Sequence, residues 1–283
     1  MILIADSGST KTSWAVVGSG ERFVTEGLNP HFTSDEAFLA ACSAVRDHFL
    51  LNSLTTVSLT TYFYGSGCGN AVQRMRVQEL LAKAFEGAEV HVETDMLGAC
   101  RAACGREWGL VGILGTGSNA CYYDGDKIAF QAVSTGYILG DEGSANYVGR
   151  RLLQDYLTGV MPRNLISRFR DAYPMTKEEF LDAVYHQPNA NRFMASLAQF
   201  AVKHINDDYC SSEILVGLYN WYIYQLEGLQ RLSYCNKLYL VGGFAAHIRP
   251  LLDIVAKEKS LEIQNVLADP MDGLLEYHSP KAT

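Results

Sequence analysis

The sequence lacks the features that mark membrane, secreted and nucleic-acid-binding proteins. No apolar run approaches the ~20 residues that a membrane-spanning helix needs. No basic segment followed by an apolar one opens the chain, as it would in a signal peptide. Lysine and arginine form no cluster and the net charge is −8, which argues against binding to nucleic-acid phosphates. We therefore expect a cytoplasmic protein with neither a membrane nor a nucleic acid as partner.

Cysteine and histidine are scarce and follow no metal-binding pattern. The seven cysteines are an odd number, lie in apolar segments and form no CxxC pair. Reduced and mostly buried thiols therefore fit them best. The seven histidines show no ligand spacing such as HExxH, so we predict no zinc site.

The sequence also has no low-complexity linker that would mark a domain boundary. With 283 residues, of which 48% are hydrophobic and 19% charged, the chain is long enough for two lobes with separate cores. We place the boundary near Gly105 and expect lobes at 1–105 and 106–283.

What the sequence does contain is one strand–turn–strand pattern, present twice. At the N-terminus an apolar strand ends at Asp6, and a turn of glycine and hydroxyl residues (7–12) leads into a second strand. The same order recurs at 110–117, followed by strands at 119–123 and 127–133. Small turn residues leave backbone N–H groups open to phosphate oxygens, and a carboxylate at a strand end suits Mg²⁺. The repeat predicts a duplicated domain whose two loops grip a polyphosphate.

The rest of the chain has the alternation of strands and helices that is typical of an α/β protein. Caps and apolar periodicity locate the other elements. They are a helix capped by Ser34, a strand at 57–64, a helix after Asn70, a strand ending at Glu93-Thr94-Asp95, a mostly helical stretch from 143 to 232 with a capping box at 176–179 and a long helix at 213–232, strands at 237–241 and 261–266, and a short helix after Pro270.

Three segments resemble the nucleotide motifs of the actin-like ATPase and sugar kinase superfamily. They are Asp6-Ser7-Gly8-Ser9-Thr10-Lys11-Thr12 for the first phosphate motif, Gly115-Thr116-Gly117-Ser118 for the second, and Leu240-Val241-Gly242-Gly243 for the adenosine motif. Within that superfamily, Gly140-Asp141-Glu142-Gly143-Ser144 together with Glu93-Thr94-Asp95 is similar to the BadF/BadG ATPase group, and specifically to N-acetylglucosamine kinases. The motifs lie in the family's order along nearly the whole chain.

This resemblance implies a fold, a reaction and partners. The fold is a duplicated ribonuclease H-like (actin-like ATPase) α/β fold, with two lobes and a central nucleotide cleft. The reaction is phosphorylation of a hydroxyl of an N-acetylated amino sugar, a small molecule, with N-acetylglucosamine as the first choice. The implied cofactors are ATP and Mg²⁺, and the implied assembly is a homodimer.

The resemblance also assigns roles to individual residues. Asp95 is the catalytic base that accepts the proton of the attacking hydroxyl, and Asp6 is the metal ligand. The nucleotide contacts are Gly8, Ser9, Thr10, Lys11, Gly115, Thr116, Gly117, Gly242 and Gly243. The sugar contacts are Asn29, Asp95, Ser118, Asn119, Thr135, Gly136 and Asp141.

Several of these residues have a plainer explanation. Asp95 and Asp141 each precede a helix and could simply cap it. Asn29 stands before Pro30 and could be an ordinary turn former. Lys11 could be an exposed lysine of a strand.

The chain departs from the N-acetylglucosamine kinase pattern at one point. Thr135-Gly136 stands where those kinases carry a Trp-Gly pair. Loss of the indole removes a stacking wall for the sugar and enlarges the site, so N-acetylmuramic acid, with its lactyl ether, becomes an alternative substrate.

Two other classes of function remain open at this point. The BadF/BadG group also contains ATPase activators of electron-transfer enzymes, which hold an iron–sulfur cluster with cysteines. Here Cys100 and Cys104 are one helical turn apart in an apolar helix, without a glycine-rich cluster loop. A sugar-sensing protein with an idle site is the other class, against which the intact Asp6, Asp95 and Asp141 argue.

Overall fold

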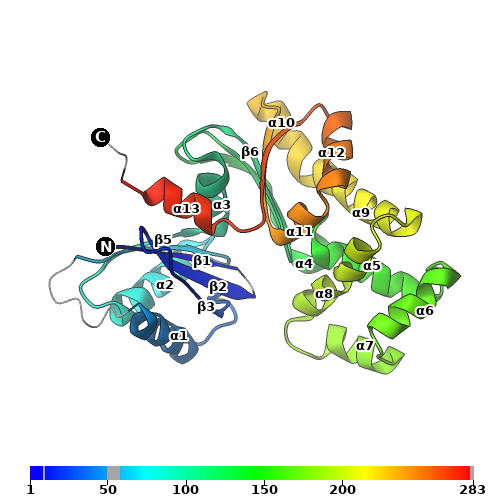
Figure 1. Ribbon diagram of the computed structural model, residues 1–283, viewed down its shortest axis with the longest axis horizontal. Helices are drawn as coiled ribbons and strands as arrows, with labels where there is room; N and C mark the ends of the chain where they lie inside the picture. Colours follow the sequence, from blue (N-terminus) through cyan, green and yellow to red (C-terminus); the bar gives the residue numbers. More distant parts are fainter. Residues whose placement is uncertain (9, 50–57, 281–283) are drawn as a thin grey trace. The chain divides into compact units, whose positions relative to one another are not determined.

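The computed structural model describes residues 1–8, 10–49 and 58–280 (Figure 1). Ser9 and Val57, the expected start of a strand, lie outside these residues. Internal contacts divide the chain into two units, one of Met1–Arg106 with the segment from Asp269 onward, and one of Glu107–Ala268. The C-terminal segment thus belongs to the first unit, whereas the division expected from the sequence assigned it to the second.

The first unit is built on a five-stranded sheet in the order β3-β2-β1-β4-β5. Its strands are β1 (Ile2–Ser7), β2 (Lys11–Val16), β3 (Arg22–Glu26), β4 (Thr60–Gly65) and β5 (Glu89–Thr94). The first three form an antiparallel meander, and β4 and β5 continue the sheet in parallel with β1.

Helices cover both faces of this sheet. They are α1 (Asp35–His48), α2 (Ala71–Ala84), α3 (Asp95–Cys104) and α13 (Met271–His278). Side chains alternate along β1, so Leu3 joins the core under α1 and α2, while Ile4 packs with Met271 and Leu274 of α13. Figure 1 shows α1 and α2 on one side of the sheet and α3 beside α13 on the other. Ser34 and Asn70 cap α1 and α2, as predicted.

The second unit repeats the same strand plan. Its sheet has the order β10-β9-β6-β7-β8, formed by β6 (Gly109–Leu114), β7 (Ser118–Tyr123), β8 (Ile128–Gln131), β9 (Lys237–Val241) and β10 (Glu262–Leu267). β6, β7 and β8 form an antiparallel meander, and β9 and β10 run parallel to β6. The predicted duplicated α/β fold is confirmed by this repetition.

The second unit also carries most of the helices. They are α4 (Gly136–Leu139), α5 (Ala145–Thr158), α6 (Arg163–Ala172), α7 (Lys177–Tyr185), α8 (Ala190–Lys203), α9 (Asp208–Trp221), α10 (Glu227–Ser233), α11 (Gly243–His247) and α12 (Arg249–Glu258). The capping box of Thr176 and Glu179 is present. None of the described helices is long and apolar enough to cross a membrane.

The long helix expected at 213–232 differs from the structure in two respects. It begins earlier, at Asp208, because Asp207 caps it by accepting the N–H of Tyr209. It is also interrupted by a π-helical segment, Tyr222–Leu226, which we call the π-turn. A π-turn accommodates one extra residue in a helix and changes which side chains face inward.

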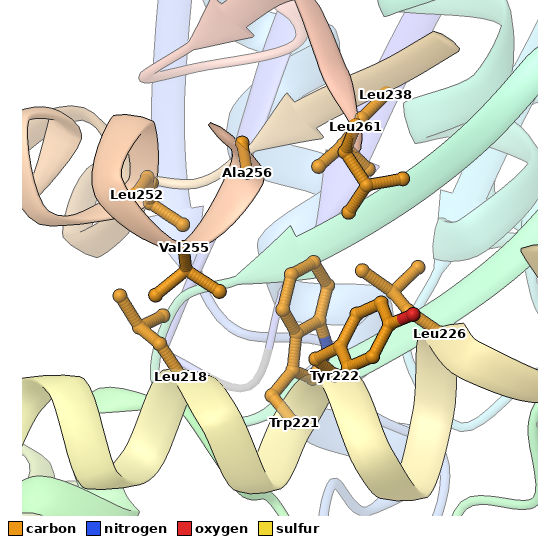
Figure 2. Close-up of a pocket in the computed structure, with 9 residues that line it drawn as sticks. All are labelled: Leu218, Trp221, Tyr222, Leu226, Leu238, Leu252, Val255, Ala256 and Leu261. Atoms are coloured by element: carbon orange, nitrogen blue, oxygen red, sulfur yellow. The ribbon is translucent and has the colours of Figure 1, made fainter. Parts of the chain in front are cut away.

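A small apolar cavity of about 10 Å³ lies in the core of the second unit. Figure 2 shows Trp221, Tyr222 and Leu226 from α9 and the π-turn on one side of it, with Leu238 and Val255 on the other. It has at most the volume of one water probe and is lined by apolar side chains, so it is a packing gap and no substrate site. The seven cysteines all lie in the described part of the chain as reduced and buried thiols, as predicted.

Candidate active site in two clusters

The first cluster centres on Asp6, at the end of β1. Its carboxylate is partly buried. Burial, helped by the negative charges of Asp269 and Asp95, raises the pKa of Asp6 to about 7, and Lys11 acts in the opposite direction. Carboxylates that disfavour one another's ionisation are stabilised by a cation placed among them. This cluster therefore suits a divalent metal ion.

Asp95 is the first residue of α3, but it is not the cap of that helix. Thr94 fills that position, because its Oγ1 accepts the N–H of Leu97 at 3.1 Å. Asp95 Oδ1 accepts the adjacent N–H of Met96 at 2.9 Å. Burial raises the pKa of Asp95, although hydrogen bonds from the backbone N–H groups of Met96 and of Asp95 itself act against this. The capping explanation for Asp95 is thus wrong, and its role as a base stays a prediction.

Lys11 forms an ion pair with Asp269, a residue for which the sequence predicted no role. Its Nζ lies 3.1 Å from Oδ2 of Asp269, whose Oδ1 accepts the N–H of Met271 at the start of α13 at 3.0 Å. Burial opposes ionisation of Asp269, but the N–H of Met271 and the charge of Lys11 outweigh it and lower its pKa. The sequence signal was an Asp before Pro270, which indicates a turn but no distant partner.

The described residues of the first phosphate motif, on either side of Ser9, form backbone hydrogen bonds near the ends of β1 and β2. The N–H of Gly8 donates to the carbonyl of Lys11 at 3.0 Å, and the carbonyl of Thr10 accepts from Gly27 at 3.1 Å. Thr10 and Lys11 are exposed. Their side chains are therefore accessible to a phosphate.

Asn29 is buried and fully positioned by two neighbouring loops. Its Oδ1 accepts the N–H of His31 at 3.0 Å, so it forms the turn expected before a proline. Its Nδ2 also donates to Ser66 Oγ, at 3.0 Å. A Cβ at Gly67 would lie 2.5 Å from Asn29 Oδ1, which explains why glycine stands there. Asn29 is thus a rigid amide, whose contact with sugar stays a prediction.

The second cluster begins with the loop between β6 and β7. Within it the N–H of Gly115 donates to the carbonyl of Gly117 at 3.0 Å. The first N–H groups of α5 hold it from outside, because Ala145 donates to Gly115 at 2.9 Å and Asn146 to Thr116 at 3.1 Å. The loop is therefore anchored to a long helix.

Asp141 faces this loop from a left-handed backbone conformation, with φ of 57°. Its Oδ1 accepts the N–H of Ser118 at 3.3 Å, and a Cβ at Gly117 would lie 2.8 Å from its Oδ2. Burial raises the pKa of Asp141, although the Ser118 N–H acts against this. The cap of α5 is Ser144, which accepts the N–H of Tyr147 at 3.1 Å. Asp141 does not cap this helix either.

The adenosine motif lies directly against the second phosphate loop. Gly242 has φ of 132°, and a Cβ there would lie 2.3 Å from the carbonyl oxygen of Leu114 and 3.2 Å from the nitrogen of Gly115. Only glycine permits this approach. A Cβ at Gly243 would meet no atom within 4 Å, so its backbone is open to a ligand.

Three further predicted sugar contacts lie in the second unit. Thr135 and Gly136 are exposed at the start of α4. A Cβ at Gly140 would lie 2.1 Å from Thr135 Oγ1, so this hydroxyl packs on the residue before Asp141. Asn119 is on β7, and its Oδ1 accepts the next backbone N–H at 2.9 Å.

The repeated sheets and their paired loops define the class of the protein, the actin-like ATPase and sugar kinase fold. No family model and no curated protein sequence matches the chain. Among solved structures, a proposed N-acetylglucosamine kinase from Porphyromonas gingivalis is 35% identical, with a TM-score of 0.91 and 98% of both chains covered. The protein therefore belongs to the same family, sugar kinases of this fold.

Two more distant structures show the fold alone. A proposed N-acetylglucosamine kinase from Chromobacterium violaceum is 20% identical, with a TM-score of 0.72 and 98% of both chains covered. A ROK family glucokinase from Streptomyces griseus, in complex with glucose and AMPPNP, is 16% identical, with a TM-score of 0.58 over 98% of this chain and 97% of the other. The predicted resemblance to actin-like sugar kinases is confirmed.

Proposed function

We propose that the protein is an ATP-dependent kinase that phosphorylates a hydroxyl of an N-acetylated amino sugar, with N-acetylglucosamine as substrate. The observation that carries the proposal is the partly buried carboxylate of Asp95. This residue does not cap α3 and lies in the same cluster as Asp6. The 35% sequence identity with a proposed N-acetylglucosamine kinase supports an N-acetylated amino sugar as the substrate. We also propose that the protein belongs to the BadF/BadG group, is cytoplasmic and forms a homodimer.

The chain's residues fit the cofactors that this reaction needs. Within the described residues, no group of three His, Cys, Asp or Glu side chains could hold a metal ion by itself. Mg²⁺ typically binds one or two carboxylates and completes its shell with water and phosphate oxygens. Asp6 supplies such a carboxylate, and Thr10 and Lys11 supply phosphate donors. When bound, Mg²⁺ neutralises charge that develops on the transferred phosphoryl group.

Each remaining residue then has a specific task. Asp95 accepts the proton of the attacking hydroxyl. Its raised pKa makes it a stronger base than an exposed aspartate. Asn29 and Asp141 hydrogen-bond sugar hydroxyls from fixed positions, and the backbone of Gly243 supports the nucleotide.

The direct test is a coupled ADP-release assay over N-acetylglucosamine, N-acetylmannosamine, N-acetylmuramic acid and glucose. We expect turnover with an N-acetylated hexosamine above that with glucose. If no sugar in the panel raises ADP release above the sugar-free rate, the proposed function is wrong.

N-Acetylmuramic acid is the second candidate substrate, and one observation favours it. Thr135 and Gly136 are exposed beside the acidic loop, so no indole limits a bulky substituent there. An electron-transfer activator is less favoured, because Cys100 is fully buried and Cys104 is 7% exposed within the first unit. Such thiols are not displayed on a surface that a second subunit could share.

A further inference from the structure

The π-turn between α9 and α10 places an amide side chain in the core of the second unit. Gln225 lies inside this five-residue segment and is 7% exposed. Its neighbours in the same stretch, Trp221 and Leu226, are apolar and line the cavity of Figure 2. π-Turns concentrate at functional sites in proteins, so the polar residue within this one needs a reason.

Gln225 donates two hydrogen bonds from one nitrogen to two different loops. Its Nε2 lies 3.0 Å from Ser118 Oγ in the second phosphate loop and 3.3 Å from Glu142 Oε2 in the acidic loop. Glu142 fixes the orientation of the amide, because the opposite orientation would place two acceptor oxygens together. Gln225 therefore joins the two loops through a donor.

The carbonyl end of the Gln225 amide is desolvated, and no hydrogen bond within the described residues compensates for this cost. Oε1 of Gln225 is buried without a hydrogen-bond partner in the described parts of the chain, as is Nε1 of Trp221. An apolar side chain of similar size would avoid the cost of burying an unpaired carbonyl. The fold accepts this cost, which indicates that the donor end of Gln225 has a role other than packing.

The contacts of Gln225 close a ring that contains Asp141. Ser118 accepts from Gln225 through its hydroxyl and donates its backbone N–H to Asp141 Oδ1 at 3.3 Å. Glu142, the second partner of Gln225, is the next residue after Asp141. We propose that Gln225 is a positioning residue that clamps the acidic loop to the second phosphate loop and so orients Asp141 toward a sugar hydroxyl. The sugar part of this inference rests on the proposed function.

The clamp predicts a specific effect of losing Gln225 on the sugar KM. The amide of Gln225 donates to Ser118 and Glu142, whereas Gly115 and Thr116 are held by the first N–H groups of α5, so loss of Gln225 leaves this part of the nucleotide motif anchored. Loss of the clamp allows Asp141 to leave Ser118, which weakens recognition of the sugar. The sugar KM should therefore rise while nucleotide affinity stays unchanged.

The first experiment compares Gln225→Met with Gln230→Met. Gln230 is a matched control, because its amide bonds to Asn236, to Lys259 and to the hydroxyl of Tyr222 in the same π-turn, whereas the amide of Gln225 bonds to the two loops. Hydrogen–deuterium exchange of the Ser118 N–H and of peptides that cover 140–144 should accelerate at least about tenfold in Gln225→Met and stay unchanged in Gln230→Met, while exchange at 115–117 stays near wild type in both. Equal exchange in both variants would overturn the clamp. This readout does not depend on any catalytic activity.

The second experiment measures kinetics in a charge-swapped pair. Gln225→Glu places a carboxylate beside Glu142 and should raise the sugar KM by about 10- to 100-fold, with ADP affinity within about twofold of wild type. In the double variant Gln225→Glu with Glu142→Gln, position 142 is the donor and position 225 the acceptor, so the hydrogen bond is restored. The sugar KM should then return most of the way to the wild-type value. Failure of this rescue in a folded double variant contradicts the clamp. If wild type uses no sugar while the exchange result holds, the proposed function fails and the clamp stands.

Discussion

The aspartates of the two clusters differ in what their neighbours leave them free to do. Asp141 has one oxygen on a backbone N–H and the other beside Gly117, so it suits fixed hydrogen bonding. Burial raises the pKa of Asp95, which suits a proton acceptor. Asp6 lies among other negative charges, which favours a cation. The three carboxylates are chemically identical, so their different surroundings give them different properties.

Replacement of Asp95 by asparagine tests its role as the base. Asp95→Asn should lower kcat by about 10²–10⁴, the usual effect of losing a general base, with substrate affinities within a few-fold. Steady-state kinetics with the preferred hexosamine measures this. Thr94→Ala is the control, because it removes the cap of α3 and should lower stability by about 1 kcal/mol without this loss of kcat. Normal turnover of Asp95→Asn would remove Asp95 from the mechanism.

The raised pKa of Asp6 predicts that Mg²⁺ binding displaces a proton. Between its ordinary pKa of 3.8 and about 7, the folded protein keeps Asp6 protonated, whereas Mg²⁺ needs the carboxylate. Calorimetry of Mg²⁺ or Mg²⁺–ADP binding at pH 6, in buffers of different ionisation enthalpy, should show proton release. Asp6→Asn should bind Mg²⁺ more weakly and release none. Proton release that persists in the variant would place the metal elsewhere.

The same pKa shift has a consequence for folding stability. The folded state holds more protons than the unfolded state between pH 3.8 and about 7, so the contribution of Asp6 to stability falls as pH rises through this window. Bound metal should reverse that trend.

The choice of sugar can be tested at Thr135. An aromatic ring contributes roughly 0.5–1.5 kcal/mol of stacking beyond its buried area, which is up to about tenfold in affinity. Thr135→Trp should therefore shift kcat/KM toward N-acetylglucosamine and away from N-acetylmuramic acid. If wild type rejects the muramic sugar and the variant leaves the ratio unmoved, Thr135 does not line the sugar site.

Helix α13 is attached to the first unit through a chain of polar and aromatic contacts. Arg101 Nη1 donates to Tyr64 Oη at 2.8 Å, and Tyr64 Oη shares a second hydrogen bond with Nε2 of His278, also at 2.8 Å. The ring of Tyr62 stacks on that of His91, with centroids 4.6 Å apart, and contacts the tilted ring of His278, with centroids 4.0 Å apart. His278 can accept the Tyr64 hydroxyl at Nε2 only when its ring is neutral.

This attachment predicts that acid weakens α13. Burial, with the charges of Arg101 and His91, lowers the pKa of His278 to about 4. The unfolded state then binds more protons between about pH 6.5 and 4, so stability falls as pH falls through that window. Thermal unfolding at pH 7.5 and pH 5 should show a smaller pH effect in His278→Phe than in wild type. An equal pH effect in both proteins would contradict the assignment.

Local elements were predictable from the sequence, and distant pairings were not. The caps Ser34, Asn70 and Thr176 depend on residues within three positions and were recognised. The ion pair of Lys11 with Asp269 joins residues 258 positions apart, for which spacing gives no signal. The two motif loops were identified by small residues, but the roles of Thr94 and Ser144 as caps required the backbone geometry.

The π-turn was missed for a different reason. Apolar periodicity at 213–232 indicated a helix, and a single extra residue changes that period too little to register. In the sequence, Gln225 is one polar residue within the long helix expected at 213–232, and nothing near it indicates a partner. Its partners Ser118 and Glu142 lie 107 and 83 positions away, so only the fold reveals the clamp.

The molecule consists of two units with separate hydrophobic cores, and one unit contains both ends of the chain. Met271 and Leu274 of α13 are fully buried against Ile4 and Ala15 of the first sheet. The core of the second unit is formed by residues between 110 and 261. A defect in α13 should thus affect the first unit selectively.

Leu274→Ala tests this division. Truncation of a buried leucine costs about 2–5 kcal/mol, and hydrogen exchange in β1 and β4 should accelerate while that in β6 and β7 stays near wild type. Glu276→Ala, on the exposed side of the same helix, should change neither. Equal acceleration in both sheets would show that the units unfold together.

The insertion of one unit within the other also sets an order of events on the ribosome. About 160 residues separate Arg106 from Asp269, which at ~5–20 residues per second takes roughly 8 to 32 seconds to synthesise. During that time the second unit can complete its core, whereas the sheet face formed by Ile4, Ala15 and Tyr64 waits for Met271 and Leu274. The nascent chain therefore exposes this apolar surface of the first unit until Met271 and Leu274 have been synthesised.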